Sequence, residues 1–271
     1  MTGPTGQPLA ARPDLVRLAN VTMHYGRGKA AVHVLNDVSL TIKKGEIIAV
    51  VGPSGCGKSS LMKLISGLHM ASAGTVEVEG KAVKSPLKSV GMAFQASNLL
   101  PWRTVVNNVL LPLEIVQPHR GRIRRERAAY RAKAVTLLES VGLKGVADKF
   151  PWEMSGGMQQ RTSICRALVH EPDILMLDEP FGALDAFTRE ELWCALRDIQ
   201  AARGVTVMLV THDLREAVFL ADTVYVMSNR PGRIVNRTEI TLHRPRDLEV
   251  TYTQPFQDLV HQLRSHIGGH H

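Results

Sequence analysis

The sequence has few cysteines and no long apolar run, and both absences limit what the protein can be. Its three cysteines, Cys56, Cys165 and Cys194, show neither a C-x-x-C spacing nor a metal-ligand spacing. Because no signal-peptide pattern is evident either, we expect a reducing environment rather than a disulfide framework. The longest apolar runs, residues 47–51 and 205–210, are far shorter than the roughly 18–20 residues of a membrane span. They suit buried parallel strands, so the chain is not expected to cross a bilayer alone.

Acidic residues are in the minority. The chain of 271 residues has 33 Lys and Arg against 25 Asp and Glu, a formal charge of +8. Such a balance favours anionic partners such as nucleotides, nucleic acid or an anionic membrane face. The basic residues cluster in residues 119–133, which is typical of a solvated helix face or, as the second interpretation, of contact with anionic lipid. Nucleic acid is not expected as a partner, because aromatic residues do not interleave with most of this basic run.

Strand and helix patterns alternate along the chain without an internal repeat. Alternating segments such as 38–42 and 75–80 predict a small antiparallel sheet, whereas the apolar runs predict a mainly parallel sheet with helices on its faces. One core interrupted by a helical insertion fits this order better than two tandem domains. The predicted organisation is a flexible tail over 1–13, a main domain over 14–240 with a helical subdomain at about 97–170, and a C-terminal extension with one helix over 241–271.

A glycine-rich loop at residues 52–60 follows one of the predicted buried strands. Gly52, Gly57, Lys58 and Ser59 match the G-x-x-x-x-G-K-[ST] pattern, with a helical segment directly after it. The backbone N–H groups of such a loop bind phosphate oxygens, the lysine reaches the β- and γ-phosphates, and the hydroxyl ligates Mg²⁺. The alternative is a glycine-rich turn with an incidental lysine. The residues predicted to bind the nucleotide here are Gly52, Pro53, Ser54, Gly55, Cys56, Gly57, Lys58, Ser59 and Ser60.

Two adjacent carboxylates follow a second buried strand. Residues 174–177 are apolar and lead to Asp178 and Glu179. A carboxylate at the end of a buried strand that faces a phosphate loop is placed to hold Mg²⁺, and Glu179 is the candidate for activating the attacking water. The alternative is a solvated turn. These features predict an α/β fold of the P-loop NTPase type, with a RecA-like core of mainly parallel sheet, a small antiparallel β subdomain and an inserted helical subdomain.

Taken in order, the motifs resemble those of the ATP-binding subunit of ABC transporters, over nearly the whole chain except its two tails. The resemblance implies that Tyr25 stacks on adenine and that Gln95 touches Mg²⁺ and the attacking water. It implies that Asp185, in the segment 183–185, lies near a dimer axis and that His212 hydrogen-bonds the γ-phosphate. For Tyr25 the alternative is an ordinary strand aromatic, and for His212 a structural role at a strand end.

The segment "SGGMQQ" at residues 155–160 puts a serine and two glycines at what looks like the start of a helix, and it resembles the signature motif of the same family. The resemblance implies a head-to-tail homodimer in which the signature of one subunit covers the γ-phosphate of ATP held by the loop of the other. Two positions depart from the usual motif, because Met154 stands for a leucine and Met158 for a frequent glutamine. The departure at Met158 weakens any claim of a side-chain contact there. The signature residues predicted to act in trans are Ser155, Gly156, Gly157 and Met158.

Residues 96–109, 178–189 and 227–234 look most like ATPases of the nitrate, sulfonate and taurine importers. That resemblance implies an ATP- and Mg²⁺-dependent hydrolase at the cytoplasmic face of the inner membrane, attached to membrane permease subunits and served indirectly by a solute-binding protein. Residues 99–102 would form an apolar dock for a permease helix, or would pack internally. An exporter, a lipid transporter and a non-transport ABC ATPase are the alternatives. A GTPase is not expected, because the N-K-x-D motif is absent from the sequence.

Overall fold

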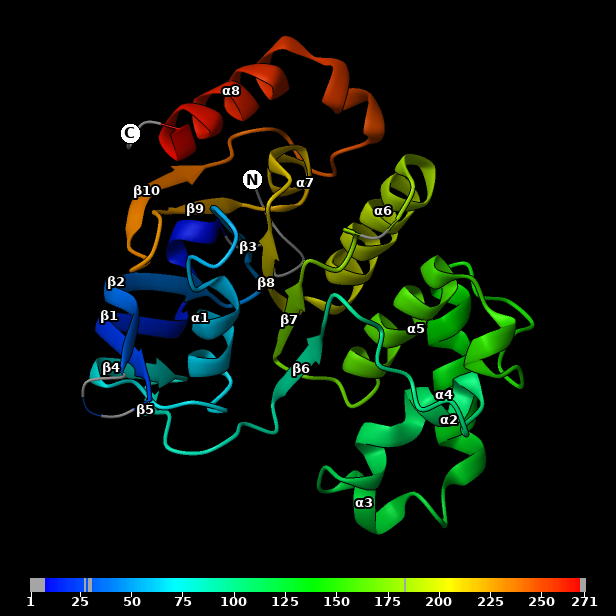
Figure 1. Ribbon diagram of the computed structural model, residues 1–271. Coiled ribbons are helices and arrows are strands. Elements are labelled where there is room, and N and C mark those ends of the chain that lie inside the picture. Colours follow the sequence, from blue (N-terminus) through cyan, green and yellow to red (C-terminus); the bar gives the residue numbers. More distant parts are fainter. Residues whose placement is uncertain (1–7, 27, 29–30, 183, 269–271) are drawn as a thin grey trace. The chain divides into compact units, whose positions relative to one another are not determined.

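The computed structural model describes residues 8–26, 28, 31–182 and 184–268 (Figure 1). The chain divides into two compact units. The first unit consists of residues 1–87 and 200–271, and the second unit of residues 88–199. The second unit is wider than the helical subdomain predicted at about 97–170, because it includes the strands through which the chain enters and leaves the helical segment.

An antiparallel sheet forms one part of the first unit. Its strands lie in the order β2-β1-β4-β5. Buried and exposed side chains alternate along much of β1 and β2, as the period-two sequence pattern predicts. The strand bounds are β1 (Asp14–Tyr25), β2 (Val32–Lys43), β4 (Ala73–Val78) and β5 (Lys81–Ala82).

Four further strands of the first unit form a mainly parallel arrangement. Strand β3 (Ile47–Val51) pairs in parallel with both β8 (Thr206–Thr211) and β9 (Thr223–Met227), and β10 (Ile234–Glu239) pairs antiparallel with β9. Every residue of β3, β8 and β9 is buried, which explains their nearly continuous apolar sequences. The phosphate loop leaves β3 and runs into α1 (Lys58–Ile65).

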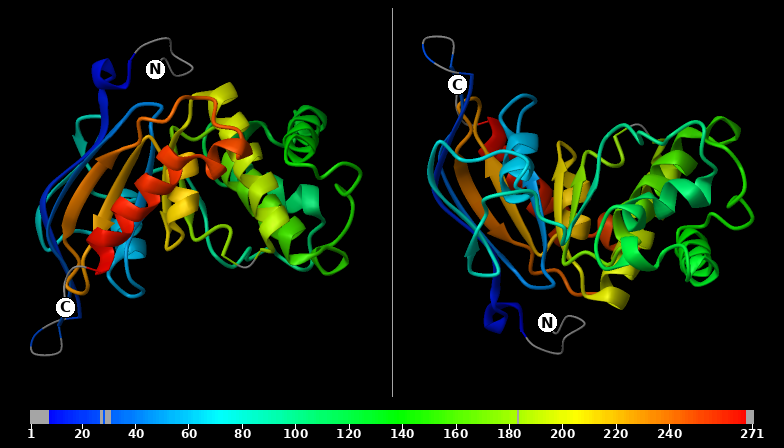
Figure 2. Two further views of the ribbon diagram at one scale, coloured as in Figure 1. Left: turned by 90° about the horizontal axis from the view of Figure 1, so that it is seen from above. Right: turned by 90° about the horizontal axis from the view of Figure 1, so that it is seen from below.

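The C-terminal extension packs on this part of the first unit. It contains a short 3-10 helix, η5 (Leu248–Tyr252), and α8 (Gln254–Gly268), the helix that the sequence predicts. Helix α8 contacts β9, β10 and α7 (Leu214–Leu220), and Figure 2 shows it lying across the strands. Phe256 and Leu263 are fully buried, so the apolar face of α8 is the face that holds the extension in place.

The second unit is mostly helical and is closed by two parallel strands, β6 (Val90–Ala93) and β7 (Ile174–Asp178). The chain leaves β6, builds a set of short helices and returns through β7. The longest helix is α6, most of which belongs to this unit. The helices are α2 (Val105–Leu110), η3 (Leu111–Glu114), α3 (His119–Arg122), α4 (Arg127–Ser140), η4 (Pro151–Glu153), α5 (Gly156–Leu168) and α6 (Ala186–Arg203).

The N-terminal segment differs in part from the prediction of a flexible tail over residues 1–13. Residues 1–7 lie outside the described part of the chain, but residues 9–11 form a 3-10 helix. Arg12 is only 7% exposed, and its Nη1 donates to the carbonyl oxygen of Gly45 at 3.1 Å. Because a buried guanidinium needs such partners, this contact orders the segment. No helix within the described residues has the length and apolarity of a membrane span.

Candidate functional site

The phosphate loop of the first unit has a geometry that requires glycine. Gly57 has φ of +109°, and a Cβ added there would lie 2.6 Å from the Cδ2 atom of Leu35. The loop therefore turns where a side chain would clash and strain the backbone. The ammonium of Lys58 is buried and donates to the carbonyl oxygens of Gly52 at 2.8 Å and Pro53 at 3.0 Å. These two hydrogen bonds hold the ammonium of Lys58, the one positive side chain of the loop, against the loop backbone.

Tyr25, which is predicted to stack on adenine, lies next to the loop. Tyr25 ends β1, and its hydroxyl lies 3.3 Å from the Oγ of Ser60 in the first turn of α1. The ring of His69 meets the Tyr25 ring edge-on, with centroids 5.2 Å apart. By contrast, Cys56 is buried within the loop, and burial raises the pKa of its thiol. Cys56 therefore fills space as a protonated thiol, whereas Tyr25 stands beside the phosphate loop.

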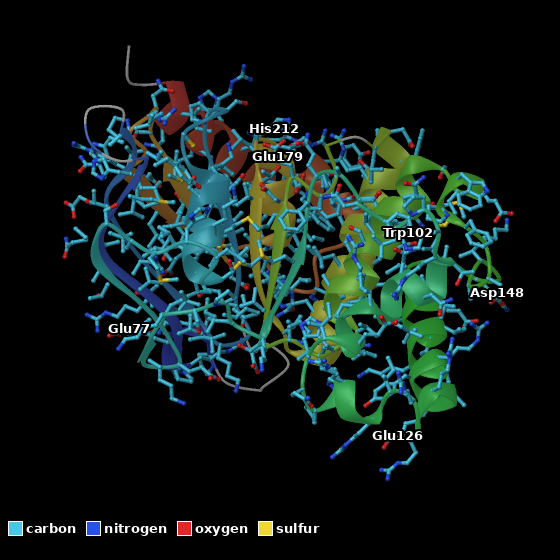
Figure 3. The ribbon with its side chains drawn as sticks, turned by 60° about the horizontal axis from the view of Figure 1, so that its bottom comes forward. Glu77, Trp102, Glu126, Asp148, Glu179 and His212 are labelled. Carbon is cyan, nitrogen blue, oxygen red and sulfur yellow. The ribbon has the colours of Figure 1, made fainter. Side chains whose placement is uncertain are left out.

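His212 emerges at the same strand edge as the phosphate loop. It follows Thr211, which pairs with Val51, and Val51 directly precedes the loop. The ends of parallel strands meet at one edge of a sheet, so both segments start there. Asp213 then caps α7, accepting from the N–H groups of Arg215 at 2.8 Å and Glu216 at 3.3 Å. The exposed His212 is thereby fixed between a strand end and a capped helix start (Figure 3).

The acidic pair of the second unit lies at the end of β7. Asp178 is the last residue of this buried strand, and Glu179 follows it with φ of +45° (Figure 3). A left-handed conformation is uncommon for residues other than glycine, and such strain concentrates at functional sites. Ala93 of β6 pairs with Leu177 of β7, so the segment containing Gln95 begins at the same strand edge as Asp178. Within this unit, the segment containing Gln95 and the acidic pair therefore both start at one edge of the β6–β7 pair.

The signature segment lies at the start of α5, as the sequence predicts. Ser155 is the N-cap, and its Oγ accepts from the N–H of Met158 at 3.3 Å. A Cβ on Gly157 would lie 3.1 Å from the Cγ2 of Thr188, whereas a Cβ on Gly156 would meet nothing within 4 Å. One glycine therefore permits close packing on α6 and the other leaves the helix start open. Met154, the substitute for leucine, is buried.

A cavity of about 420 Å³ in the second unit collects the signature residues with Asp185. Its lining includes the four consecutive signature residues Ser155, Gly156, Gly157 and Met158. Asp185, which lies much later in the chain, lines the same cavity. The Oδ1 of Asp185 accepts from the N–H of Thr188 at 3.0 Å, and hydrogen bonds from Thr188 lower the pKa of this carboxyl. The cavity thus combines a helix start, which favours anions, with a fixed carboxylate.

Helix α5 also holds the segment that follows β6, which the sequence did not reveal. The Nε2 of Gln160 donates to the carbonyl oxygen of Phe94 at 3.0 Å, and Arg166 donates to those of Ser97 at 2.7 Å and Asn98 at 2.8 Å. The segment containing Gln95 is therefore tied to the signature helix. The sequence offered no signal for these contacts beyond the polar character of Gln160 and Arg166.

The turn after Gln95 presents an exposed tryptophan. Trp102 is 71% exposed, which excludes internal packing for this member of the predicted dock. The turn is fixed by the buried Asn108, whose Oδ1 accepts from the N–H of Leu100 at 2.7 Å and whose Nδ2 donates to Leu100 and Arg103 carbonyls at 3.0 Å. An exposed tryptophan on a rigid turn is typical of a surface that binds another protein.

The predicted metal ligands are Ser59 of the first unit and Gln95 and Asp178 of the second. A hydroxyl, an amide oxygen and a carboxylate are oxygen donors only, and such a donor set suits Mg²⁺ rather than a thiophilic metal. The residues therefore fit the ion that the phosphate loop implies. Among described residues, no cluster of three or more His, Cys, Asp or Glu side chains could hold another metal.

Comparison with known proteins identifies the family. The ABC transporter family profile matches residues 35–182. The aliphatic sulfonates import ATP-binding protein SsuB of Bacillus licheniformis is 44% identical over 222 residues, covering 82% of this chain and 83% of the relative. The taurine import ATP-binding protein TauB of Yersinia pestis is 44% identical over 214 residues, covering 79% of this chain and 80% of the relative.

Solved structures agree with the sequence comparisons. The ATP-binding cassette MJ0796, in a dimeric post-hydrolysis state bound to ADP and Pi, has a TM-score of 0.71 and 30% identity, covering 84% of this chain and 100% of that chain. The fold and the phosphate loop define a P-loop NTPase, which confirms the predicted fold class. More narrowly, the chain belongs to the ABC transporter family and is an ATPase of that family.

Proposed function

We propose that this chain is the ATP-hydrolysing subunit of a membrane importer for a small anionic solute such as nitrate, a sulfonate or taurine, with sulfonates or taurine as the favoured class. The observation that carries the ATP-hydrolysing role is the cavity in which the signature residues and Asp185 meet. A single-chain switch or kinase has no need of a second anion-favouring helix start. A subunit that must cover the phosphates of another copy does need one.

In the proposed reaction, the phosphate loop holds the nucleotide phosphates and Lys58 neutralises the β- and γ-oxygens. Tyr25 stacks on the adenine, which is typically worth about 1–3 kcal/mol. Glu179 accepts the proton of the attacking water, and His212 hydrogen-bonds the γ-phosphate. Two observations support this assignment: the strands before His212 and before the phosphate loop end at one edge in the first unit, and the strands before Gln95 and before Glu179 end at one edge in the second.

Mg²⁺ would be held by Ser59, Gln95 and Asp178, and when bound it would neutralise charge on the β- and γ-phosphate oxygens. Gln95 would also orient the attacking water. The ties from α5 to the carbonyl oxygens of Phe94, Ser97 and Asn98 would transmit movements between the signature helix and the metal ligand. This coupling links occupancy of the nucleotide site to the position of the signature.

The proposed working assembly is a head-to-tail homodimer on two permease subunits at the cytoplasmic face of the membrane. Each ATP is shared between Lys58 of one copy and Ser155 of the other. The exposed Trp102 contacts a permease helix, and a solute-binding protein delivers the solute to the permease. The relatives named for sulfonate and taurine import support an importer rather than an exporter.

Uptake by cells that lack the gene tests this function. We expect loss of uptake of labelled taurine or alkanesulfonate, restoration by the wild-type gene, and no restoration by Lys58→Ala, since that variant removes the charge on the phosphates. Lys63→Ala, a lysine on the same helix away from the loop, serves as the control and should restore uptake. Uptake of all these solutes at wild-type rates in the deletion strain would refute the solute class.

A further inference from the structure

The second unit has another cavity, which shares no lining residue with the signature cavity. It measures about 590 Å³ and lies among the residues from α2 to the start of α4. Ligand pockets are commonly about 300–1,000 Å³, so the space is adequate for a small molecule or a lipid headgroup. Three guanidinium side chains line it, those of Arg120, Arg124 and Arg127, together with the aliphatic Leu110 and Ile123.

The charge of this cavity is not balanced by the protein. Its one carboxylate, Glu114, is occupied by Arg103, whose Nη1 lies 2.8 Å from the Oε1 of Glu114. Within the described part of the chain, none of the three lining arginines forms an ion pair with a carboxylate. Three cations around one space repel each other, and an anion bound among them would remove that repulsion.

Other cations of the same basic run do have carboxylate partners. Arg131 lies 2.8 Å from Asp148, and Lys133 lies 2.8 Å from Glu171. A uniformly solvated basic face would not concentrate unpartnered arginines around a single concavity. Trp102 is not among the residues that line this cavity, and Figure 3 shows Trp102 and Glu126, a neighbour in sequence of two lining arginines, at different places on this unit.

We propose that this cavity binds a phosphate-bearing anion. Arginine presents a planar fork of donors that matches phosphate oxygens, and several such forks around one space select phosphate over a monovalent halide. The aliphatic side chains of Leu110 and Ile123 favour a ligand with a carbon skeleton beside its phosphate. Both the headgroup of an anionic phospholipid and a soluble phosphate ester satisfy this chemistry.

Two matched pairs of substitutions test whether the arginines act as a site. Arg124→Gln with Arg127→Gln removes two lining charges, and Arg122→Gln with Arg125→Gln removes two exposed charges of the same run outside the lining. Cosedimentation uses the full chain with phosphatidylcholine vesicles containing phosphatidylglycerol, and with pure phosphatidylcholine vesicles as the neutral reference. The lining pair should weaken binding to the anionic vesicles about tenfold and the control pair about twofold or less.

A charge-preserving variant separates a cavity from diffuse attraction. Gly121 lines the cavity, and a Cβ added there meets only the Oε1 of Gln117, at 3.8 Å. Gly121→Leu therefore adds volume at the cavity lining without changing the charge, and its Cβ is accommodated without a clash. It should weaken binding as the lining pair does. Unchanged thermal unfolding of each variant identifies a loss of binding as specific rather than as a loss of folding.

The soluble source is tested by calorimetric titration with glycerol 3-phosphate, with the phosphate loop first filled by a non-hydrolysable ATP analogue and Mg²⁺. Arginine-dependent titration with unchanged vesicle binding assigns a soluble phosphate ester. Arginine-dependent vesicle binding without titration assigns a lipid headgroup. Equal weakening by the lining and control pairs, an unaffected Gly121→Leu variant and no titration would together overturn the site and leave only a basic surface.

Discussion

At the scale of single residues, the most informative position is Glu179. It lies in the left-handed region directly after a buried strand, where a glutamate has no intrinsic preference to be. Strain of this kind costs about 1 kcal/mol or more and persists because the surrounding structure imposes it. The sequence named Glu179 as the base from its place after an apolar run, and the backbone conformation adds an independent reason to assign it a role.

Glu179→Gln should stop ATP turnover while leaving ATP binding intact, because glutamine has nearly the same shape but does not accept a proton from water. Glu171→Gln is the matched control, since Glu171 is another glutamate of the second unit with a left-handed φ of +55°. Steady-state phosphate release and binding of a fluorescent ATP analogue measure the two effects. Turnover within about threefold of wild type would contradict the assignment of Glu179 as the base.

The buried His170 should make the free energy of unfolding depend on pH. Burial lowers the pKa of this imidazole below its ordinary value, and the nearby positive charges of His119 and Lys133 lower it further. A lowered pKa in the folded state means that the unfolded chain takes up the proton first as the pH falls. The stability is therefore complete above the unfolded pKa of about 6.5 and decreases below it.

Denaturant unfolding at pH 7.5 and pH 5.5 measures this effect. His170→Phe, which does not titrate, should lose less stability between the two values than the wild type, by up to about 1.4 kcal/mol per pH unit below 6.5. The exposed His243→Phe is the control and should keep the wild-type pH dependence. An identical pH dependence in all three proteins would show that His170 titrates normally.

At the scale of elements, the C-terminal extension is attached to the end of helix α7 by arginine. Arg246 is 2% exposed, and its Nη1 donates to three carbonyl oxygens at the end of α7, at 2.7–3.0 Å. Arg244 adds a bond to the Leu220 carbonyl oxygen and an ion pair of 2.7 Å with Asp222. The final carbonyls of a helix lack intrahelical partners, so these guanidinium groups cap α7.

Arg246→Met should destabilise the first unit by about 3 kcal/mol, because it leaves buried carbonyl oxygens without donors. The amides of residues 214–221 should exchange with solvent faster, since the end of α7 loses its cap. Arg264→Met on the exposed face of α8 is the control and should change neither quantity. Normal protection of α7 in the Arg246→Met protein would show that apolar packing of α8 alone holds the extension.

At the scale of the whole molecule, one chain carries two anion-favouring devices on two different units. The phosphate loop belongs to the first unit and the signature helix start to the second. The signature lines a cavity of its own with Asp185, so its residues have a structural context that does not involve the loop. This organisation favours the hypothesis that two copies of the chain share each nucleotide.

A heterodimer with one defect in each chain tests sharing in trans. One chain carries Lys58→Ala and the other Ser155→Arg, with different tags so that the mixed dimer can be purified. If sites are shared, one site has both defects and the other has none, so the mixed dimer should trap about half as much ATP as the wild type. Each homodimer should trap almost none. A purified mixed dimer that traps no ATP would show that each site forms within one chain.

The sequence by itself determined the motifs and the elements that carry them. The phosphate loop, the strand before Asp178 and the signature at the start of α5 were predictable, because glycine spacing, apolar runs and N-cap chemistry are local properties. The apolar periodicity of residues 254–267 likewise predicted α8. Short strands such as β6, with four residues, gave no sequence pattern strong enough to predict.

Only the tertiary structure decided which distant residues meet. The pairing of Ala93 with Leu177 and of Val51 with Thr211 sets Gln95 and His212 at their strand edges. The same is true of the ordering of Arg12, the contacts of α5 with residues 94–98, and the arginine-lined cavity of residues 107–127. These features depend on which surfaces pack together, and packing is a property of the assembled chain that no local pattern encodes.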